Sequence, residues 1–138
     1  MEADGSWSLD SDASGFEKME SGLNARAADF ARFGLLFARD GAWRGRQLAP
    51  RAWVRDPTLA PTRVGRAPAG SYQYFWWVQD QRRPRAQFAR GKYGQHIYVV
   101  PASDLVRFGR DTGYPYWPEL LDDLARRLDE AAPATTRP

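Results

Sequence analysis

Residues 72–78 hold the densest aromatic run in the chain, and this run limits the folds that the sequence can adopt. Two sets of side chains alternate there: Tyr72, Tyr74 and Trp76, and between them Gln73, Phe75 and Trp77. Alternation with period two in a segment rich in aromatic residues predicts one strand, with one set on each face. Side chains of this size stabilise a sheet only when other layers cover them, so the chain must build or join a sizeable core.

The composition supports one folded domain. The chain has 138 residues, of which 43% are hydrophobic and 14% aromatic, which excludes wholesale disorder. It has no Cys, so disulfides and thiolate metal sites are excluded, and its only histidine, His96, cannot form a multi-histidine zinc site. We therefore expect neither a metal nor a cofactor.

The charge pattern argues against nucleic-acid or membrane partners. The net charge is +3, but the basic residues are scattered apart from Arg82 to Arg85, where Pro84 breaks the run. This short run is more typical of a solvated hairpin loop than of a nucleic-acid arm, although an Arg-mediated nucleic-acid binder remains a weaker alternative. There is no apolar run of eighteen residues, so no membrane span is expected. The acidic, polar first residues do not form a signal peptide, and the sequence indicates no compartment.

The pattern along the chain predicts an α+β fold of the α/β-sandwich type, in which helices flank an antiparallel meander. Residues 1–22 are polar with isolated apolar anchors such as Trp7, and we expect an irregular segment on a surface. A helix is expected over residues 25–39, capped by Asn24, with Phe30, Phe33 and Phe37 as its buried stripe and Gly41 closing it.

The remaining elements follow from turn residues and periodicity. We expect a short extended piece (43–48), a helical turn (51–55) ended by Pro57, a loop (56–70), and four strands (72–78, 87–90, 96–100 and 105–110). A tight turn at 91–94 joins the second and third strands. A final helix is expected from Pro118 to Glu130, with Leu120, Leu121, Leu124 and Leu128 as its buried stripe. Residues 1–132 would form the domain, and 133–138 a disordered tail.

No self-contained catalytic motif is present. No Ser is followed by Lys three positions later, and Asn24 has Gly22 two positions before it, so neither Ser-x-x-Lys nor Tyr-x-Asn occurs. A Ser-His-acid triad would have to use His96, which lies within a strand pattern, and there is no Gly-x-Ser-x-Gly elbow.

Three stretches, in this order, carry a resemblance to a known family. Residues 21–34 resemble a Gly-Leu-x-Ser/Thr-x-x-Asp-Leu-Ala-Arg-Phe-Gly helix, and residues 43–54 resemble the short turn that follows it. Residues 72–77 and 88–106 resemble an aromatic strand, a Gly-x-x-Gly-Gln turn, an apolar strand, Pro and Asp-Leu-Val. The pattern is similar to the C-terminal part of the superfamily of class C β-lactamases, penicillin-binding proteins, related esterases and 6-aminohexanoate-dimer hydrolases.

The resemblance implies a partial β-lactamase/transpeptidase-like fold from a serine hydrolase that cleaves a small amide or ester through an acyl-enzyme. In that superfamily the nucleophilic Ser, its Lys and the general base precede the region matched here. We therefore expect this chain to be a C-terminal portion, truncated or started at an internal Met. Its partner would be the missing N-terminal half of the same fold, and the chain alone would be inactive.

The resemblance also assigns candidate site residues. Ala89-Arg90-Gly91 match the family's Lys-Thr-Gly motif, with Ala89 in place of the cationic residue, so carboxylate recognition through that position is in doubt. The backbone N–H of Lys92 would be one oxyanion-hole donor, and Gly91 would let substrate approach the strand. Ala89, Arg90, Gly94 and Gln95 would contact substrate.

Simpler interpretations of these residues remain open. Gly91 and Gly94 could be plain turn glycines, Gln95 could satisfy backbone groups at a bulge, and His96 could be an ordinary strand residue. A different class of function is a non-catalytic interaction domain that binds a partner through its aromatic sheet. If the N-terminal half is absent, one sheet face should lack cover, either that of Phe75, Trp77, Ile97 and Val99 or its opposite.

Overall fold

The fold is an antiparallel sheet between helices. The structure is a computed structural model that describes residues 2–18, 21–59, 71–79, 85–110 and 117–131. Its main sheet has the order β5-β6-β7-β8-β9, and every neighbouring pair is antiparallel. The strands are β5 (Ser71–Gln73), β6 (Trp76–Gln79), β7 (Ala86–Arg90), β8 (Gln95–Val100) and β9 (Leu105–Arg110). The expected α+β antiparallel meander is confirmed.

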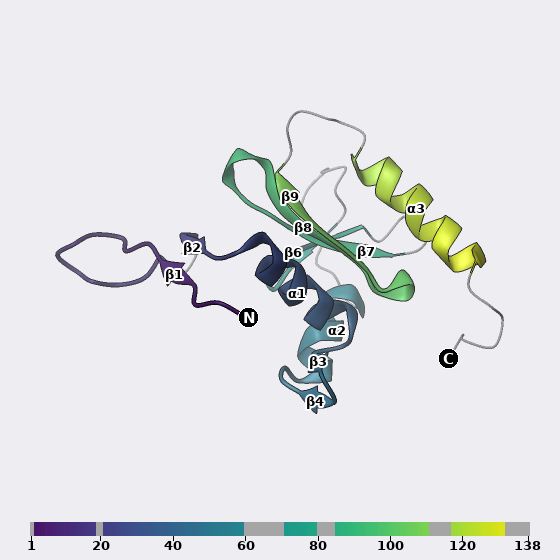
Figure 1. Cartoon of the computed structure of the whole chain (residues 1–138), viewed down its shortest axis with the longest axis horizontal. Coiled ribbons are helices and arrows are strands. Elements are labelled where there is room, and N and C mark those ends of the chain that lie inside the picture. Colours follow the sequence, from purple (N-terminus) through teal and green to yellow (C-terminus); the bar gives the residue numbers. More distant parts are fainter. Residues whose placement is uncertain (1, 19–20, 60–70, 80–84, 111–116, 132–138) are drawn as a thin grey trace.

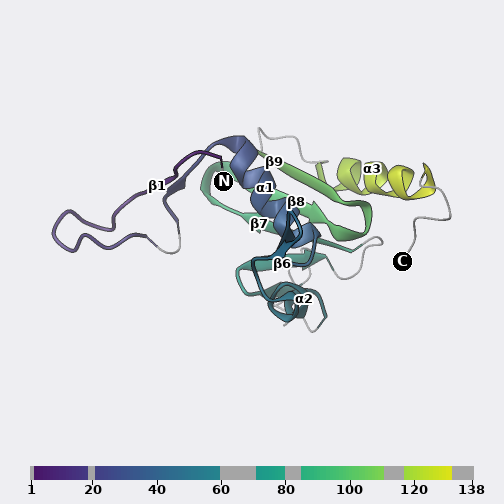
Figure 2. The same ribbon diagram turned by 60° about the horizontal axis from the view of Figure 1, so that its bottom comes forward.

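Helices lie on both faces of this sheet. Helix α1 (Ala27–Ala38) packs on β8 and β9, and helix α3 (Trp117–Ala131) runs along the other face, while α2 (Arg51–Leu59) lies beside β6 (Figures 1 and 2). Two small hairpins complete the description: β1 (Ser6–Trp7) with β2 (Leu23–Asn24), and β3 (Ala42–Trp43) with β4 (Arg46–Gln47). The polar segment that joins β1 to β2 extends away from the body in Figure 1.

The α1 face of the sheet holds the first core cluster. Its buried members are Phe37, Val54, Trp76, Ile97 and Val99. Phe30 stacks on Phe108 with ring centroids 4.7 Å apart, so the start of α1 is fixed to the outer strand β9. The expected phenylalanine stripe is confirmed only in part, because Phe33 stacks on Trp76 but stays 46% exposed.

Gly34 sets how closely α1 approaches the sheet. A Cβ at this position would lie 2.6 Å from Val106 Cγ1 and 2.8 Å from Ile97 Cγ2. Both carbons belong to β-branched side chains, which are stiff at χ1 and cannot easily move aside. The missing side chain therefore lets the helix lie directly on β8 and β9.

Gly34→Ala is expected to destabilise the fold by about 1–3 kcal/mol through overpacking, which exceeds the roughly 1 kcal/mol gained in helix propensity. Urea unfolding monitored by circular dichroism measures the free energy of unfolding. Val106→Ala removes one of the two clashing methyls, so its combination with Gly34→Ala should cost less than the sum of the single changes. A more stable Gly34→Ala variant would contradict the close approach.

The α3 face holds a second cluster, with Ala86, Tyr98, Val100, Leu121 and Ala125 buried. An aromatic row crosses this face from strand to strand, with successive centroids 4.8, 6.4 and 6.1 Å apart: Tyr72, Trp77, Phe88 and Tyr98. The Tyr98 hydroxyl oxygen lies 2.7 Å from Gln79 Oε1 and 2.8 Å from Asp122 Oδ1 of α3, within hydrogen-bond distance of both, which ties the helix to the sheet.

The leucine stripe expected in the last helix is largely wrong. Only Leu121 is buried, whereas Leu120, Leu124 and Leu128 are 47%, 41% and 44% exposed. The helix packs through Leu121 and Ala125 instead, which turns the other leucines outward. We call these three residues the outer leucines.

The single aromatic strand expected over 72–78 is also wrong, because Tyr74 and Phe75 form a two-residue turn between β5 and β6. Both residues have positive φ, 49° and 67°, as a type I′ hairpin turn requires. Neither is Gly or Asn, so the sequence carried no turn signal. Tyr74 stacks flat on Trp53, with a 4.6 Å centroid distance and 2° between the ring planes, which supports the strained turn.

Other local expectations need smaller corrections. Asn24 does not cap the first helix: its Nδ2 donates to the Gly22 carbonyl, and Arg26, in an extended conformation, takes the N-cap position. Residues 43–48 form a hairpin whose turn, Arg44–Gly45, has positive φ at both positions. The second helix does not end before Pro57 but continues to Leu59.

Several expectations fall outside the residues that the structure describes. Most of the 56–70 loop, the Arg82–Pro84 part of the basic run and the 133–138 tail lie outside the described residues. The sheet face expected to lack cover is not that of Ile97 and Val99, which α1 buries. Trp77 lies on the opposite face, and Phe75 is a turn residue that is 80% exposed.

Candidate functional site

The connection between β7 and β8 carries the residues that the resemblance assigned. Gly91 follows β7, and its N–H donates to the Gln95 carbonyl over 2.8 Å, which closes the connection. Between them lies the short 3₁₀ turn η1 (Lys92–Gly94), with Tyr93 in the left-handed region at φ 64°. Lys92 is the first residue of this turn, a position whose amide has no partner within the turn. Among the described residues, no hydrogen bond from its N–H to a backbone carbonyl is found.

The two glycines of this connection differ in whether the backbone conformation requires glycine at that position. Gly94 has φ 73°, so the turn itself requires it. Gly91 is extended, with φ −113° and ψ 176°, and a Cβ there would meet nothing nearer than 3.8 Å. Neither the backbone nor a neighbour requires Gly91, so the turn interpretation explains Gly94 alone.

A cavity of about 700 Å³ opens beside this connection. One wall comes from the N-terminal segment, with Trp7 and residues 21–25, and a second comes from the start of α1, with Ala27 and Phe30. The strand wall completes it: Ala89, Gly91, Lys92, Tyr93, Gln95, His96, Ile97 and Phe108. We call this space the groove, and its volume lies within the range of small-molecule sites.

The groove brings together most of the assigned residues. Ala89, Gly91, Lys92 and Gln95 line it, whereas Arg90 and Gly94 do not. Strand alternation places Arg90 on the opposite face from Ala89, and Gly94 lies within the turn rather than on the strand. His96 also lines the groove, and its Nδ1 lies 3.1 Å from the Gly94 carbonyl oxygen. The assignment of these residues to a substrate is a proposal that follows below.

The N-terminal wall of the groove was missed from the sequence. Trp7 Nε1 donates to the carbonyls of Lys18 and Ser21, and the Ser8 amide donates to the Gly22 carbonyl, so the polar segment folds back on itself. The only signal was a tryptophan in an otherwise polar stretch. That signal indicated surface contact, but it could not indicate which surface.

Asp29 anchors the same segment to α1. Its Oδ1 accepts the Glu2 amide over 2.8 Å and the Arg32 guanidinium over 3.0 Å, and Arg32 also pairs with the Glu2 carboxylate. The Glu2 amide, with help from Arg32, lowers the pKa of the Asp29 carboxyl against the opposing effect of burial. The second oxygen, Oδ2, is buried without a hydrogen-bond partner among the described residues.

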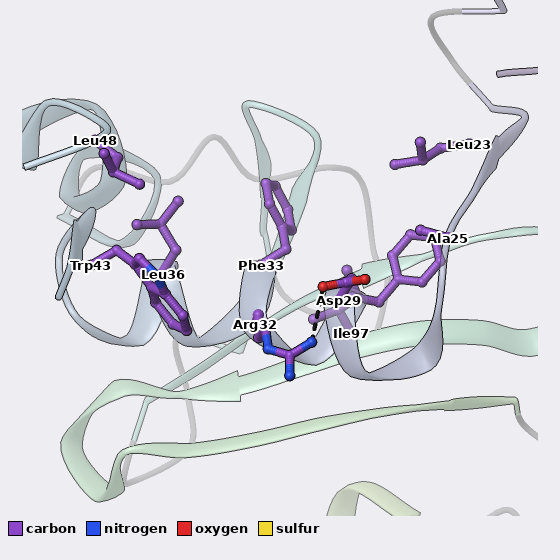
Figure 3. A pocket seen from close by; sticks show the side chains of 10 residues that line it. Leu23, Ala25, Asp29, Arg32, Phe33, Leu36, Trp43, Leu48 and Ile97 are labelled. Atoms are coloured by element: carbon purple, nitrogen blue, oxygen red, sulfur yellow. Dashed lines mark hydrogen bonds and ion pairs between the residues drawn. The ribbon is translucent and has the colours of Figure 1, made fainter. Parts of the chain in front are cut away.

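A smaller pocket of about 240 Å³ adjoins the groove (Figure 3). Its walls are mostly apolar, with Phe33, Leu36, Trp43 and Leu48 on one side. Leu23, Ala25, Phe30 and Ile97 line both spaces, so the two share one boundary. Asp29 and Arg32 form the polar part of the small pocket, joined by the dashed contact in Figure 3.

Two further observations concern sites of other kinds. Within the described ranges, no three His, Asp or Glu side chains gather as metal ligands would. In the same part of the chain, no helix has the length and apolar character needed to cross a membrane.

Comparisons with known proteins fit this geometry. No protein-family model matches the chain. A 6-aminohexanoate-dimer hydrolase of Paenarthrobacter ureafaciens is 26% identical over 145 residues, which cover 94% of this chain and 37% of that protein. A solved structure, described as a putative 6-aminohexanoate-dimer hydrolase from Bacillus anthracis, matches with a TM-score of 0.70 and 26% identity, over 87% of this chain and 33% of that one.

These matches define the class of fold and the relatives. The fold is a β-lactamase-like α+β fold. The resemblance to 6-aminohexanoate-dimer hydrolases is confirmed, and the chain spans about a third of the length of the relatives that it matches, which fits the expected C-terminal portion.

Proposed function

We propose that this chain forms one wall of the active site of a β-lactamase-related serine hydrolase that cleaves a small amide or ester. The nucleophilic Ser, its Lys and the general base would come from a preceding segment of the same fold. This chain would supply the Lys92 N–H as one oxyanion-hole donor. An amide of this kind contributes by stabilising the negative charge that develops on the carbonyl oxygen.

The observation that carries the proposal is an amide without a backbone partner among the described residues, next to a glycine that the backbone does not require, beside a cavity. Lys92 and Gly91 both line the groove, and the Lys92 N–H has no backbone partner among the described residues. Gly91 has an extended backbone that any residue adopts, and a Cβ there would make only ordinary contacts, so neither φ nor packing requires glycine. Together, the two features would let the carbonyl of a ligand approach the strand and accept a hydrogen bond there. Gly91 and Lys92 would therefore serve catalysis, and Ala89 and Gln95 would contact substrate.

The test is complementation of the missing parts. The chain alone should not hydrolyse nitrophenyl esters, a chromogenic cephalosporin or the linear dimer of 6-aminohexanoate above background, because it lacks a nucleophile. Joined to an upstream segment that contains Ser-x-x-Lys and Tyr-x-Asn, it should turn over an ester or amide. Turnover by the isolated chain that disappears when one of its own residues is changed would refute the proposal.

Gly91→Ala provides a matched variant in the same experiment. It should lower turnover of the joined protein while leaving its melting temperature unchanged, since a Cβ there makes only ordinary contacts with Gln95, at 3.8 Å or more. Gly45→Ala is the control, because Gly45 also has open space but lies in the β3–β4 turn. Its positive φ of 78° means that this control should affect stability alone.

A second candidate function is a non-catalytic domain that binds a protein partner. The outer leucines of α3 favour it, because they form an exposed apolar stripe along the helix. Apolar surface of this kind marks an interface. In the hydrolase proposal, the missing segment of the same fold covers that stripe instead.

A further inference from the structure

The charge of the groove indicates which substrates it favours. Of the described residues that line it, Lys92 is the only Lys, Arg, Asp or Glu, and the rest are apolar, small or amide-bearing, apart from His96 and the hydroxyl groups. No described Asp or Glu lines it. An ammonium in a partly apolar cavity without a carboxylate attracts anions.

The Lys92 ammonium contacts the ring of its neighbour in the chain, and both residues line the groove. Its Nζ lies over the Tyr93 ring, 5.3 Å from the centroid, a cation–π contact. Tyr93 adopts the left-handed conformation at φ 64°, which is costly for a bulky residue, and this conformation brings its ring beside Lys92. The contact favours a position of the ammonium over the Tyr93 ring.

We propose, as a refinement that rests on the proposed function, that the Lys92 ammonium selects substrates bearing a carboxylate close to the scissile carbonyl. Ala89 leaves the family's cationic position without a charge, and Lys92 supplies one from three residues further along the chain. One residue then acts twice: its backbone N–H receives the carbonyl oxygen, and its side chain pairs with the carboxylate. The scissile carbonyl and the carboxylate of the substrate must therefore be no further apart than the length of a lysine side chain.

The apolar lining completes the selection. Trp7, Phe30, Tyr93 and Phe108 surround the groove with aromatic surface, which suits the hydrocarbon part of an acyl group. The expected substrates are aliphatic amides or esters with a carboxylate on the part that lies against Lys92. Their cationic counterparts, with an ammonium in the same place, should be disfavoured by repulsion.

Binding of hexanoate and of the neutral hexanamide to the 138-residue chain tests the proposal without any turnover. Isothermal titration should give hexanoate a Kd about threefold to tenfold lower than that of hexanamide, as for a partly exposed ion pair. Lys92→Met, which keeps the backbone N–H, should abolish the difference, and Lys92→Arg should keep it. The preference should also shrink as salt is raised.

The outcomes separate this proposal from the one on which it rests. A hexanoate preference that survives in Lys92→Met would assign the anion to the backbone amide and overturn the side-chain role, as would equal or absent binding of both probes. Near-ultraviolet circular dichroism confirms that each variant keeps the fold. Failure of complementation would refute the hydrolase proposal alone, because the binding comparison needs no nucleophile.

Discussion

Lys92→Pro in the joined protein is expected to lower kcat about 10²–10³-fold, the effect of losing one oxyanion-hole donor. Lys92→Ala, which keeps the N–H, should lower kcat toward a neutral nitrophenyl ester by no more than a few fold. The contrast isolates the backbone amide, because only proline removes that donor. Stopped-flow or steady-state kinetics with the neutral ester measures it and avoids any contribution from the ammonium.

The local geometry should limit the effect of Lys92→Pro to the loss of the amide donor. Lys92 is the first residue of a 3₁₀ turn, where proline is well tolerated, and the preceding Gly91 has the extended conformation that proline requires before it. Since the Lys92 N–H has no backbone partner among the described residues, its loss should not destabilise the fold. Equal kcat values in the proline and alanine variants, with equal melting temperatures, would contradict the oxyanion assignment.

The later half of the sheet was predictable because its signals are local and agree. Residues 95–100 and 105–110 alternate or run apolar, and Pro101 and Asp104 mark the turn between them. Strand boundaries there were right within a residue, and the β7–β8 turn followed from Gly91 and Gly94. Four of the six assigned site residues then fell on one groove without any tertiary information.

The aromatic hairpin could not be predicted because its turn breaks the usual rule. Tyr74 and Phe75 favour strands, yet both adopt positive φ. What decides the conformation is a contact distant in sequence, the stacking of Tyr74 on Trp53 of α2. The N-terminal wall of the groove could not be predicted for a related reason, because it depends on a contact between Asp29 and Glu2, which are 27 positions apart in the sequence.

The burial predicted for the outer leucines is wrong for a reason that concerns the whole molecule. Periodicity identified an apolar stripe correctly, but a stripe predicts burial only if the covering layer is present. In the structure, Leu121 and Ala125 meet the sheet while Leu120, Leu124 and Leu128 do not. The sequence therefore describes a helix with more apolar surface than this sheet can cover.

The isolated chain is accordingly expected to associate through the outer leucines. In addition, β9 is an outer strand of the sheet, and no described strand pairs with its free edge. Exposed apolar surface beside an open edge favours dimers or larger aggregates. Size-exclusion chromatography with light scattering should show a mass above 15.7 kDa at micromolar concentration, and joining the upstream segment should restore a monomer.

Replacing Leu120, Leu124 and Leu128 together by Gln separates association from folding. Because these side chains are roughly half exposed, the variant should be monomeric, or much less associated, with a melting temperature within a few degrees of the parent chain. Leu121→Gln is the opposite control, since it puts an amide into the second cluster and should unfold α3 from the sheet. Leu48→Gln, an exposed leucine at β4, should leave association unchanged.

If the parent chain is instead a monodisperse monomer with sharp near-ultraviolet signals and cooperative melting, its apolar surfaces need no partner. The chain would then be a domain able to stand alone, and the proposal that a preceding segment of the same fold covers it would fail.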